Sequence, residues 1–373
     1  MANIIFTPIA LCLRFFKIII LPINVSQIGN VIWLDCFLRE NRQNNKKYRL
    51  IIVPASTHIA ANPYLLSLYS DHVYLAKNLF EYLILFNLWI NPFCTDSLIR
   101  FDAGGSSLDV HKTLGKDSKN KKPIIKMSEN DQLKALNLLS PIGLNLNDKF
   151  VVLHVRDSGY YQDYKKSRNA NVDNYMDAIK YILKKGYKVV LLGSHKSIKL
   201  RDSDKLIKDG FIDYAHSGLK KDFIDIFLMS NCEFLLGTDS GPAFVVPLFH
   251  KNVIMTNAMP PSRSLWFLEG DLSIFKKIKS LKTKKLIELS EILSPKFYEL
   301  KQIKNMEKLG YEVIENSNTE ILDAVVEFFH PKKNISHSNM IKKTTKLGCR
   351  NYDALGNFSN SFLELNFFND ANK

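Results

Sequence analysis

The sequence is poor in the features that mark several classes of protein. Its five cysteines lie far apart and form no C-x-x-C pair, which excludes a disulfide framework and a zinc finger. Only 16 of the 373 residues are glycine and 13 are proline, so the chain is neither collagen-like nor of low complexity. We therefore expect reduced thiols in a globular, cytoplasmic protein.

Long uninterrupted apolar segments are also missing. The first 23 residues are apolar, but Arg14 and Lys17 stand in the middle of them. A membrane-spanning helix needs about 20 apolar residues, and cations near its centre are costly. We expect a buried strand over 18–23, preceded by a packed or interfacial segment. A membrane anchor over 1–23 is the alternative.

Acidic residues are fewer than basic ones, 37 against 51, which gives a net charge of +14. Such a charge suits an anionic partner, whether nucleic acid, membrane phosphate or nucleotide. The surplus is scattered lysine over 112–126, 276–285 and the C-terminal tail. Because no nucleic-acid-binding motif accompanies it, we expect no nucleic acid partner.

What the chain does have is a regular alternation of strand and helix patterns. Apolar runs of strand length occur at 16–23, 50–54, 150–155, 187–192, 211–214, 233–236 and 252–256. Helical patterns occur at 31–40, 62–91, 130–139, 173–185, 221–231 and 242–249, and 112–122 is typical of a linker or surface loop. Continuous apolar strands predict sheets covered on both faces, and the alternation predicts parallel βαβ units.

The length predicts two domains. We place an N-terminal domain at 1–145 and a C-terminal domain at 146–330. Beyond it, 331–373 is predicted to be a loosely packed basic tail, except for the apolar patch Phe362 to Phe368.

Ligands of open parallel sheets bind at the C-terminal ends of strands, so the residues after each strand matter most. The strand at 150–155 leads into His154, Arg156 and Asp157. His154 and Arg156 share one face, because side chains alternate along a strand. The donor fork of arginine suits a diphosphate; the alternative is an ion pair with Asp157 or another acid. Arg168 follows in a polar loop, where a solvated role is the alternative.

Two further strand ends carry glycine. Gly29 follows the first strand, and Gly193 with Ser194 follows the strand at 187–192. A glycine lets a ligand approach the backbone closely. A simple tight turn is the alternative at both places.

The segment from Gly237 to Pro242 is the most distinctive. It contains Thr238, Asp239, Ser240 and Gly241 between a buried strand and a helix. Short polar residues followed by proline at the first helical position predict an anion site at a helix start. An N-cap without a ligand is the alternative.

Several other chemistries lack their motifs. The chain has no Walker P-loop, no G-x-G-x-x-G and no H-E-x-x-H. Ser240 lacks the flanking glycines of a nucleophile elbow. Asp202 and Asp204 resemble a metal-holding pair, but they lie in a charged stretch that is typical of a solvated face. We therefore expect neither a metal site nor a cofactor.

The motifs together resemble a known group of enzymes. From about 150 to 258, the segments His154–Asp157, Arg168-Asn169 and Gly237–Pro242 resemble a bacterial family of glycosyltransferases. The His-Val-Arg segment is also similar to that of fucosyltransferases, and the segment from Thr238 resembles the D-[ST]-G segment of heptosyltransferases.

The resemblance implies a fold, a reaction and partners. The fold would be α/β and GT-B-like, with two Rossmann-like domains whose parallel sheets face a central cleft. The C-terminal domain would bind a nucleotide-sugar donor, with Arg156 on its diphosphate and Thr238 to Gly241 near phosphate or sugar. Gly29 would face the site from the N-terminal, acceptor-side domain.

Such enzymes usually work without a metal. The acceptor would be a cell-surface glycan or lipid-linked, which implies possible peripheral contact with the inner face of the cytoplasmic membrane. A non-transferring nucleotide-sugar-binding protein or epimerase of the same fold is the alternative.

One position departs from the family pattern. Heptosyltransferases carry an aspartate directly after the glycine of the first loop, and this chain has Asn30 there. An amide cannot accept a proton usefully. The candidates for a catalytic base are Asp35, His58 and Asp157, and the sequence does not choose among them.

Overall fold

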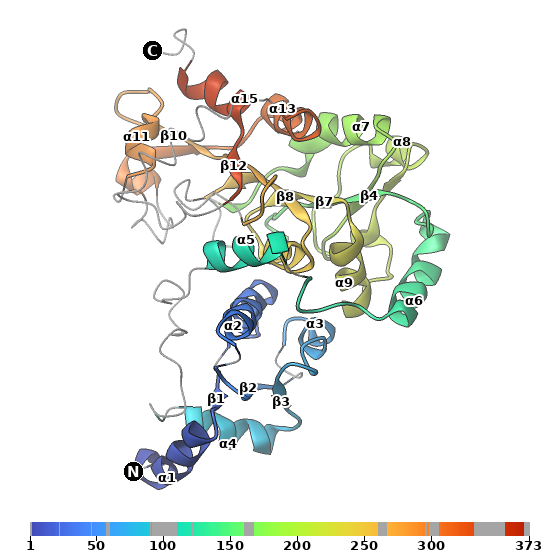
Figure 1. Cartoon of the computed structure of the whole chain (residues 1–373). Helices are drawn as coiled ribbons and strands as arrows, with labels where there is room; N and C mark the ends of the chain where they lie inside the picture. The colour runs from blue at the N-terminus through green and yellow to red at the C-terminus, as the bar shows by residue number, and fades with distance from the viewer. Residues whose placement is uncertain are drawn as a thin grey trace.

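The computed structural model describes residues 2–21, 23–45, 47–56, 60–89, 91, 110–120, 122–159, 168–259, 267–294, 297, 306–331 and 355–368. The chain forms two units, each built on a parallel sheet (Figure 1). The predicted α/β class with two parallel-sheet units is therefore confirmed.

The N-terminal unit is built on three parallel strands in the order β1-β2-β3. They are β1 (Ile18–Ile20), β2 (Leu50–Ser56) and β3 (Tyr74–Ala76). Helices α2 (Val31–Gln43) and α3 (Pro63–Ser67) lie between this sheet and the C-terminal unit, whereas α1 (Ala2–Phe15) and α4 (Leu79–Trp89) lie on its far side (Figure 1). The prediction of one largely helical stretch over 62–91 is wrong at its centre, because β3 divides it.

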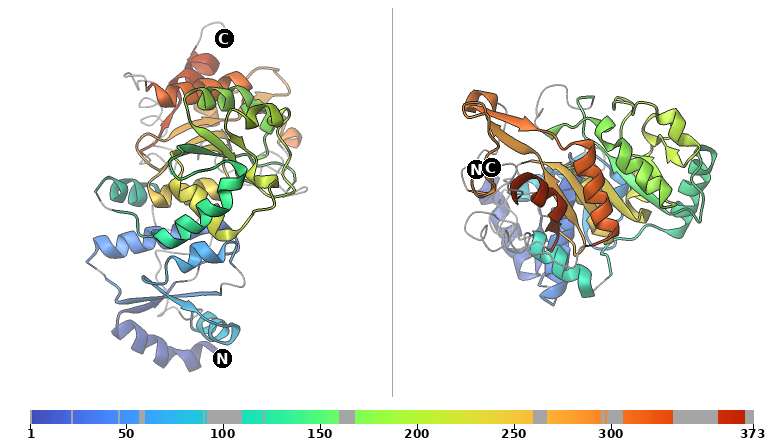
Figure 2. Two further views of the ribbon diagram at one scale, coloured as in Figure 1. Left: turned by 90° about the vertical axis from the view of Figure 1, so that its right-hand side faces the viewer. Right: turned by 90° about the horizontal axis from the view of Figure 1, so that it is seen from above.

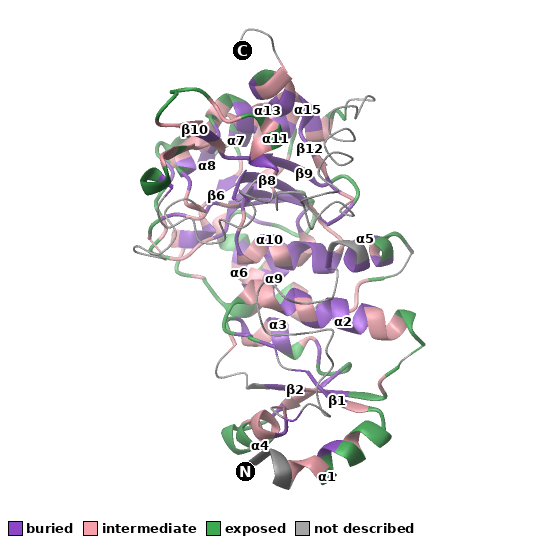
Figure 3. Ribbon diagram, turned by 90° about the vertical axis from the view of Figure 1, so that its left-hand side faces the viewer, coloured by how far each residue is buried: buried purple, intermediate pink, exposed green. Residues whose placement is uncertain are grey.

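The C-terminal unit is built on a larger parallel sheet, in the order β12-β9-β8-β7-β4-β5-β6. Its strands are β4 (Phe150–His154), β5 (Lys188–Leu191), β6 (Phe211–Ile212), β7 (Phe234–Thr238), β8 (Asn252–Ala258), β9 (Leu272–Phe275) and β12 (Asn357–Phe358). The five central strands are almost entirely buried. This burial agrees with their continuous apolar sequences and places the main core in this unit (Figure 3).

Helices cover both faces of the larger sheet (Figure 2). On the side away from the N-terminal unit lie α7 (Met176–Lys184), α13 (Asn318–Phe329) and α15 (Asn360–Leu363). On the facing side lie α9 (Asp222–Asn231) and α10 (Gly241–Val245), the latter continued by the 3-10 turn η7 (Val246–Phe249). Further elements include α6 (Glu129–Leu139), α8 (Ser203–Ile207), α11 (Leu289–Ile292) and an antiparallel pair of β10 (Lys277–Ser280) and β11 (Tyr311–Ile314).

The segment predicted to be a linker over 112–122 is instead largely the helix α5 (Val110–Asn120). Val110, Thr113, Leu114 and Asp117 are buried on one side of it, at the spacing of an amphipathic helix. Two of these four residues are polar, so the sequence pattern did not reveal the stripe. Gly115 lets this helix approach its neighbours, because a Cβ there would lie 2.8 Å from the carbonyl oxygen of Phe267.

The C-terminal tail is partly integrated into the fold, in contrast to the loose packing predicted for 331–373. β12 pairs in parallel with β9, so it forms an edge of the large sheet. The helix after it begins against Glu327 of α13, whose carboxylate accepts hydrogen bonds from the hydroxyl of Ser359 at 2.7 Å and the backbone N–H of Asn360 at 2.9 Å. Phe362, in the apolar patch that we expected to pack, is buried.

The apolar N-terminus forms a short helix and then a strand. α1 has 14 residues and ends before Phe16, and the buried strand predicted for 18–23 is present only over 18–20, as β1. Within the described ranges, no helix combines the length and the apolar character needed to cross a bilayer.

Candidate functional site

The predicted site lies where two adjacent strands end. β4 and β7 pair in parallel with His154 opposite Gly237, so the residues after both strands emerge at the same edge of the sheet. The strands approach closely there, because a Cβ on Gly237 would lie 2.2 Å from the carbonyl oxygen of His154. The backbone N–H of Arg156 donates to Oγ1 of Thr238 at 2.8 Å. This bond fixes the loop after β4 to the end of β7.

The structure brings both predicted arginines to this edge. Nε of Arg156 donates to Oδ1 of Asn169 at 3.2 Å. Arg168 donates through Nη2 to the carbonyl oxygen of Asp239 at 2.5 Å and forms an ion pair with its carboxylate at 3.2 Å. The Arg168 side chain is 25% exposed, so it is partly open to solvent and still positioned by the protein.

Lys276, which we counted among the scattered surface lysines, lies beneath the loop that contains Arg168 and Asn169. The Lys276 side chain is only 2% exposed, and Nζ donates to the carbonyl oxygen of Asn169 at 2.5 Å. Burial lowers its pKa, against the opposing effect of Glu315. No local pattern could reveal this role, because Lys276 and Asn169 are far apart in the sequence.

One ring nitrogen of His154 makes a hydrogen bond that fixes the orientation of the imidazole. Its Nδ1 lies 2.9 Å from the carbonyl oxygen of Leu192, and a carbonyl can only accept, so Nδ1 carries the proton. Burial is the main cause that lowers the pKa of this imidazole, so the ring is neutral near pH 7. Its Nε2 can then accept a hydrogen bond.

The other predicted loop residues hold the site's surroundings together. Asp157 is buried and accepts from the backbone N–H of Gly159 at 2.8 Å and of Ile198 at 2.7 Å. It therefore joins the loops after β4 and β5. Ser194 belongs to a turn in which its Oγ accepts from the N–H of Lys196. Gly193 lies in the same turn, and a Cβ there would be 2.8 Å from Oγ of Ser197.

The start of α10 has no side-chain N-cap, which was the alternative to an anion site. Oγ of Ser240 donates to the carbonyl oxygen of Thr238 at 3.0 Å, and no side chain caps the helix. The carboxylate of Asp239 forms an ion pair with Arg168. Ser240 is 7% exposed, so its contribution is to the shape of the turn.

The N-terminal unit contacts the start of α10 through Gly29. Gly29 lies in the 3-10 turn η1 (Ile28–Asn30), which packs on α10. A Cβ on Gly29 would lie 3.2 Å from Cα of Gly241, and one on Gly241 would lie 2.5 Å from Cγ2 of Ile28. The two glycines therefore meet where the units adjoin, and η1 covers part of the helix start that we expected to be open.

Two of the three candidate bases can be placed. Asp35 is fully buried in α2, where it forms an ion pair with Arg39 and accepts a hydrogen bond from the hydroxyl of Tyr69 at 3.1 Å. Asp157 is committed to backbone N–H groups. His58 lies outside the described residues. The buried, ion-paired position of Asp35 gives no support to a role as a base.

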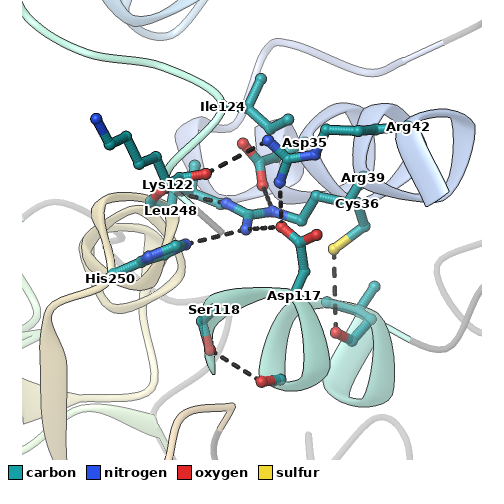
Figure 4. Close-up of polar contacts among 12 residues, drawn as sticks. Asp35, Cys36, Arg39, Arg42, Asp117, Ser118, Lys122, Ile124, Leu248 and His250 are labelled. Atoms are coloured by element: carbon teal, nitrogen blue, oxygen red, sulfur yellow. Dashed lines mark hydrogen bonds and ion pairs between the residues drawn. The ribbon is translucent and has the colours of Figure 1, made fainter. Parts of the chain in front are cut away.

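Asp35 instead belongs to a buried network between the units (Figure 4). Arg39, itself fully buried, donates through Nη1 to Asp117 of α5 at 2.6 Å and lies 3.0 Å from Nε2 of His250, directly after η7. Burial opposes the charge of Arg39, but Asp35 and Asp117 outweigh it and raise its pKa. The guanidinium therefore stays charged and joins three separate segments of the chain.

No group of three or more potential ligands among His, Cys, Asp and Glu could hold a metal ion in the parts of the chain that are described. Two guanidinium groups and the amino group of Lys276 gather around Asn169, accompanied by the carboxylates of Asp239 and Glu315. Such an arrangement can bind an anion with several oxygens.

Comparison with known proteins gives relatives only at the level of structure. No family model matches the sequence, and neither does any curated protein. A glycosyl transferase of family 9 from Veillonella parvula is 14% identical, with 64% of this chain and 80% of that chain covered and a TM-score of 0.40. The ADP-heptose lps heptosyltransferase II of E. coli is 14% identical, with 64% and 84% covered and a TM-score of 0.39.

The wall teichoic acid polymerase TagF is 10% identical, with 83% of each chain covered and a TM-score of 0.28.

Proposed function

We propose that this protein is a glycosyltransferase that moves a sugar from a nucleotide-sugar donor to a glycan or lipid-linked acceptor. The observation that carries the proposal is that Arg156 and Arg168 both make hydrogen bonds at the adjoining ends of β4 and β7. The donor would bind to the C-terminal domain, 146–330, and the acceptor would approach from the N-terminal domain, 1–145, by way of Gly29. The reaction would be metal-independent and take place in the cytoplasm.

The two arginines would hold the diphosphate of the donor. As the glycosidic bond breaks, negative charge grows on the leaving phosphate, and fixed guanidinium groups stabilise it in the transition state. Asn169 orients Arg156 through its Nε. Arg168 now pairs with Asp239, and a phosphate would take over part of that pairing.

The remaining residues of this edge would fix the orientation of the donor. Nε2 of the neutral His154 suits a hydroxyl group of the ribose or sugar, because it can accept the hydroxyl proton in a hydrogen bond. Thr238 would act indirectly, since its Oγ1 holds the backbone of Arg156. Asp157 would be a positioning residue for the loops around the donor.

The proposal is tested by thermal unfolding with UDP, GDP, ADP and CMP, each with the full-length chain. We expect at least one of them to raise the melting temperature, because a ligand that binds only the folded state stabilises it. Arg156→Ala and Arg168→Ala should each reduce that rise, because each removes a charge-assisted contact worth roughly 1.5–3 kcal/mol.

Arg201→Ala is the matched control, because Arg201 is an arginine of the same unit with a side chain that is 84% exposed. It should leave the rise unchanged. If none of the four nucleotides changes the melting temperature, or if all three variants behave alike, the proposed site is wrong.

A non-transferring nucleotide-sugar-binding protein is the second candidate. Its support is that the carboxylates at the site already have partners and are not free to act as a base. Asp157 accepts from backbone N–H groups, and Asp239 forms an ion pair with Arg168. Incubation of the protein with a donor whose nucleotide raises the melting temperature separates the two candidates. Release of free nucleotide that increases with an acceptor extract supports transfer, whereas binding without release supports the second candidate.

A further inference from the structure

Exposed apolar side chains are concentrated at one end of the molecule. In the described residues, most of the large apolar side chains that are exposed belong to α1, the turn after it, the start of β2, and α4. All of these segments belong to the N-terminal unit. Such a concentration marks an interaction surface more often than a chance feature of a soluble face.

Helix α4 is apolar on both of its sides. Leu88 is buried against the sheet, in a small cluster with Ala10 of α1. The opposite side presents Leu79, Phe80 and Leu83, which are 66%, 72% and 49% exposed. A helix that is apolar all round is normally covered on all sides, and the described residues cover this one on one side only.

Helix α1 continues the same surface. It packs on α4 through Ala10, while Phe15 at its C-terminal end is 82% exposed and Phe16 is 52% exposed. Both helices form the end of the molecule farthest from the large sheet (Figures 1 and 3). We call the exposed sides of these two helices the α1–α4 face.

Cations surround the C-terminal end of α1. Arg14, Lys17 and Arg49 are all exposed, and the backbone N–H of Arg49 donates to the carbonyl oxygen of Lys17 at 2.9 Å, so these residues are neighbours. Residues 2–21 contain no acidic residue. The carboxylate of Glu81, on α4, accepts from the hydroxyl of Tyr74 and the N–H of Lys77.

We propose that the α1–α4 face docks on an anionic lipid bilayer, with both helices lying in the plane of the interface. Phenylalanine and leucine side chains beside exposed arginine and lysine are typical of helices that lie at the boundary of headgroups and acyl chains. The cations add attraction to anionic lipid. A second copy of the chain fits less well, because a symmetric dimer through this face would bring the same cations together.

The experiment is co-sedimentation of the full-length chain with vesicles of phosphatidylcholine alone, or of phosphatidylcholine mixed with phosphatidylglycerol. We expect binding to the mixed vesicles, weakened by added salt because salt screens the cations. The double variant Phe15→Ser/Phe80→Ser should lose about tenfold or more in partitioning, since it removes two large apolar contacts with the bilayer.

Two matched control variants distinguish binding through the α1–α4 face from non-specific binding to vesicles. Leu146→Ser/Ile207→Ser removes side chains that are 69% and 55% exposed in the C-terminal unit, and it should bind as the unchanged protein does. Arg14→Glu/Lys17→Glu should lose the preference for phosphatidylglycerol, whereas Lys180→Glu/Lys184→Glu on α7 should keep it.

The proposal is overturned if the protein binds neither kind of vesicle, or if the control variants lose binding as much as the α1–α4 variants. It is also overturned if sedimentation velocity shows a dimer that Phe15→Ser/Phe80→Ser dissociates while vesicles leave the protein in solution. No nucleotide enters the experiment, so its result is independent of the proposed transferase activity.

Discussion

His250 lies where the two units of the chain meet, and its environment disfavours a second ring proton. Burial, and after it the charge of Arg39, lowers the pKa of this imidazole to about 4. Nε2 lies 3.0 Å from Nη1 of Arg39. The neutral ring can accept a hydrogen bond from this guanidinium, whereas a protonated ring would be repelled by it. Asp117 opposes this effect, and Arg42 adds to it.

A pH-dependent stability follows from this histidine. An unfolded histidine has a pKa near 6.5, so between that value and about 4 the unfolded chain binds more protons than the folded one. Stability contributed by the neutral ring is therefore present above the unfolded pKa and falls as the pH is lowered through this window. We expect a loss of about 1–2 kcal/mol, after discounting for solvent near the half-buried ring.

Urea unfolding at about pH 7 and about pH 5 measures this loss. The variant His250→Asn is the control, because asparagine tolerates the left-handed backbone found here, with φ of 58°, and does not titrate. It should show a smaller decrease in stability over the same interval. An equal decrease in both proteins would mean that other groups cause it.

At the scale of elements, α13 and the C-terminal segment depend on one carboxylate. Glu327 is 7% exposed and accepts from Ser359, from the N–H of Asn360 and from the N–H of Ser361. It thus satisfies donors at the start of α15 that would otherwise be buried without a partner.

Glu327→Ala should therefore destabilise the protein by about 2–3 kcal/mol, the cost of leaving buried donors unsatisfied. Limited proteolysis should then cleave near 355–368 earlier than in the unchanged protein. Glu312→Ala is the control, since that side chain is 48% exposed in β11. Unchanged cleavage in Glu327→Ala would show that the segment is held mainly by the apolar packing of Phe362.

The elements that the sequence predicted well are those whose signal is local. β4, β5, β7 and β8 have continuous apolar sequences, and each forms within a few residues of its predicted range. α5, β3 and β12 were missed, because their signals are not local. Asp117 is stable inside α5 because Arg39 and Arg42 of another helix form ion pairs with it, and β12 has two residues whose pairing partner lies far back in the chain.

In the candidate site too, residues with a local sequence signal were predicted and residues without one were missed. Arg156, Arg168, Thr238 and Asp239 were predicted because they follow strands, and parallel strands bring their ends together. Lys276 was missed because its position under Asn169 depends on the fold of the whole unit. The burial of Asp35 was not predicted, because a sequence does not show which side of a helix becomes buried between domains.

At the scale of the whole molecule, Arg39 joins the two units. It is fully buried with Asp35 and Asp117, and it lies against His250 and the carbonyl oxygen of Leu248 (Figure 4). Removing one member of a buried ion network leaves its partners charged in a medium of low dielectric.

Arg39→Met should therefore lower the free energy of unfolding by about 3–5 kcal/mol, measured by urea unfolding. Arg201→Met, at an exposed ion pair, should cost less than about 1 kcal/mol. If Arg39→Met does not fold, the double variant Arg39→Met/Asp35→Asn should, because it removes one of the uncompensated charges. A loss of stability in Arg39→Met no greater than in Arg201→Met would show that the network does not join the units energetically.

The order of strands in the large sheet has a consequence for biosynthesis. β9 is complete once Phe275 has been added, but its outer neighbour β12 is made only when residues 357 and 358 leave the ribosome. In the interval, β9 has an open edge of backbone donors and acceptors, which other growing chains can pair with. Ribosomes that pause within this interval should therefore yield chains that aggregate, and the late translation of β12 leaves the nascent protein exposed to its neighbours until this strand pairs.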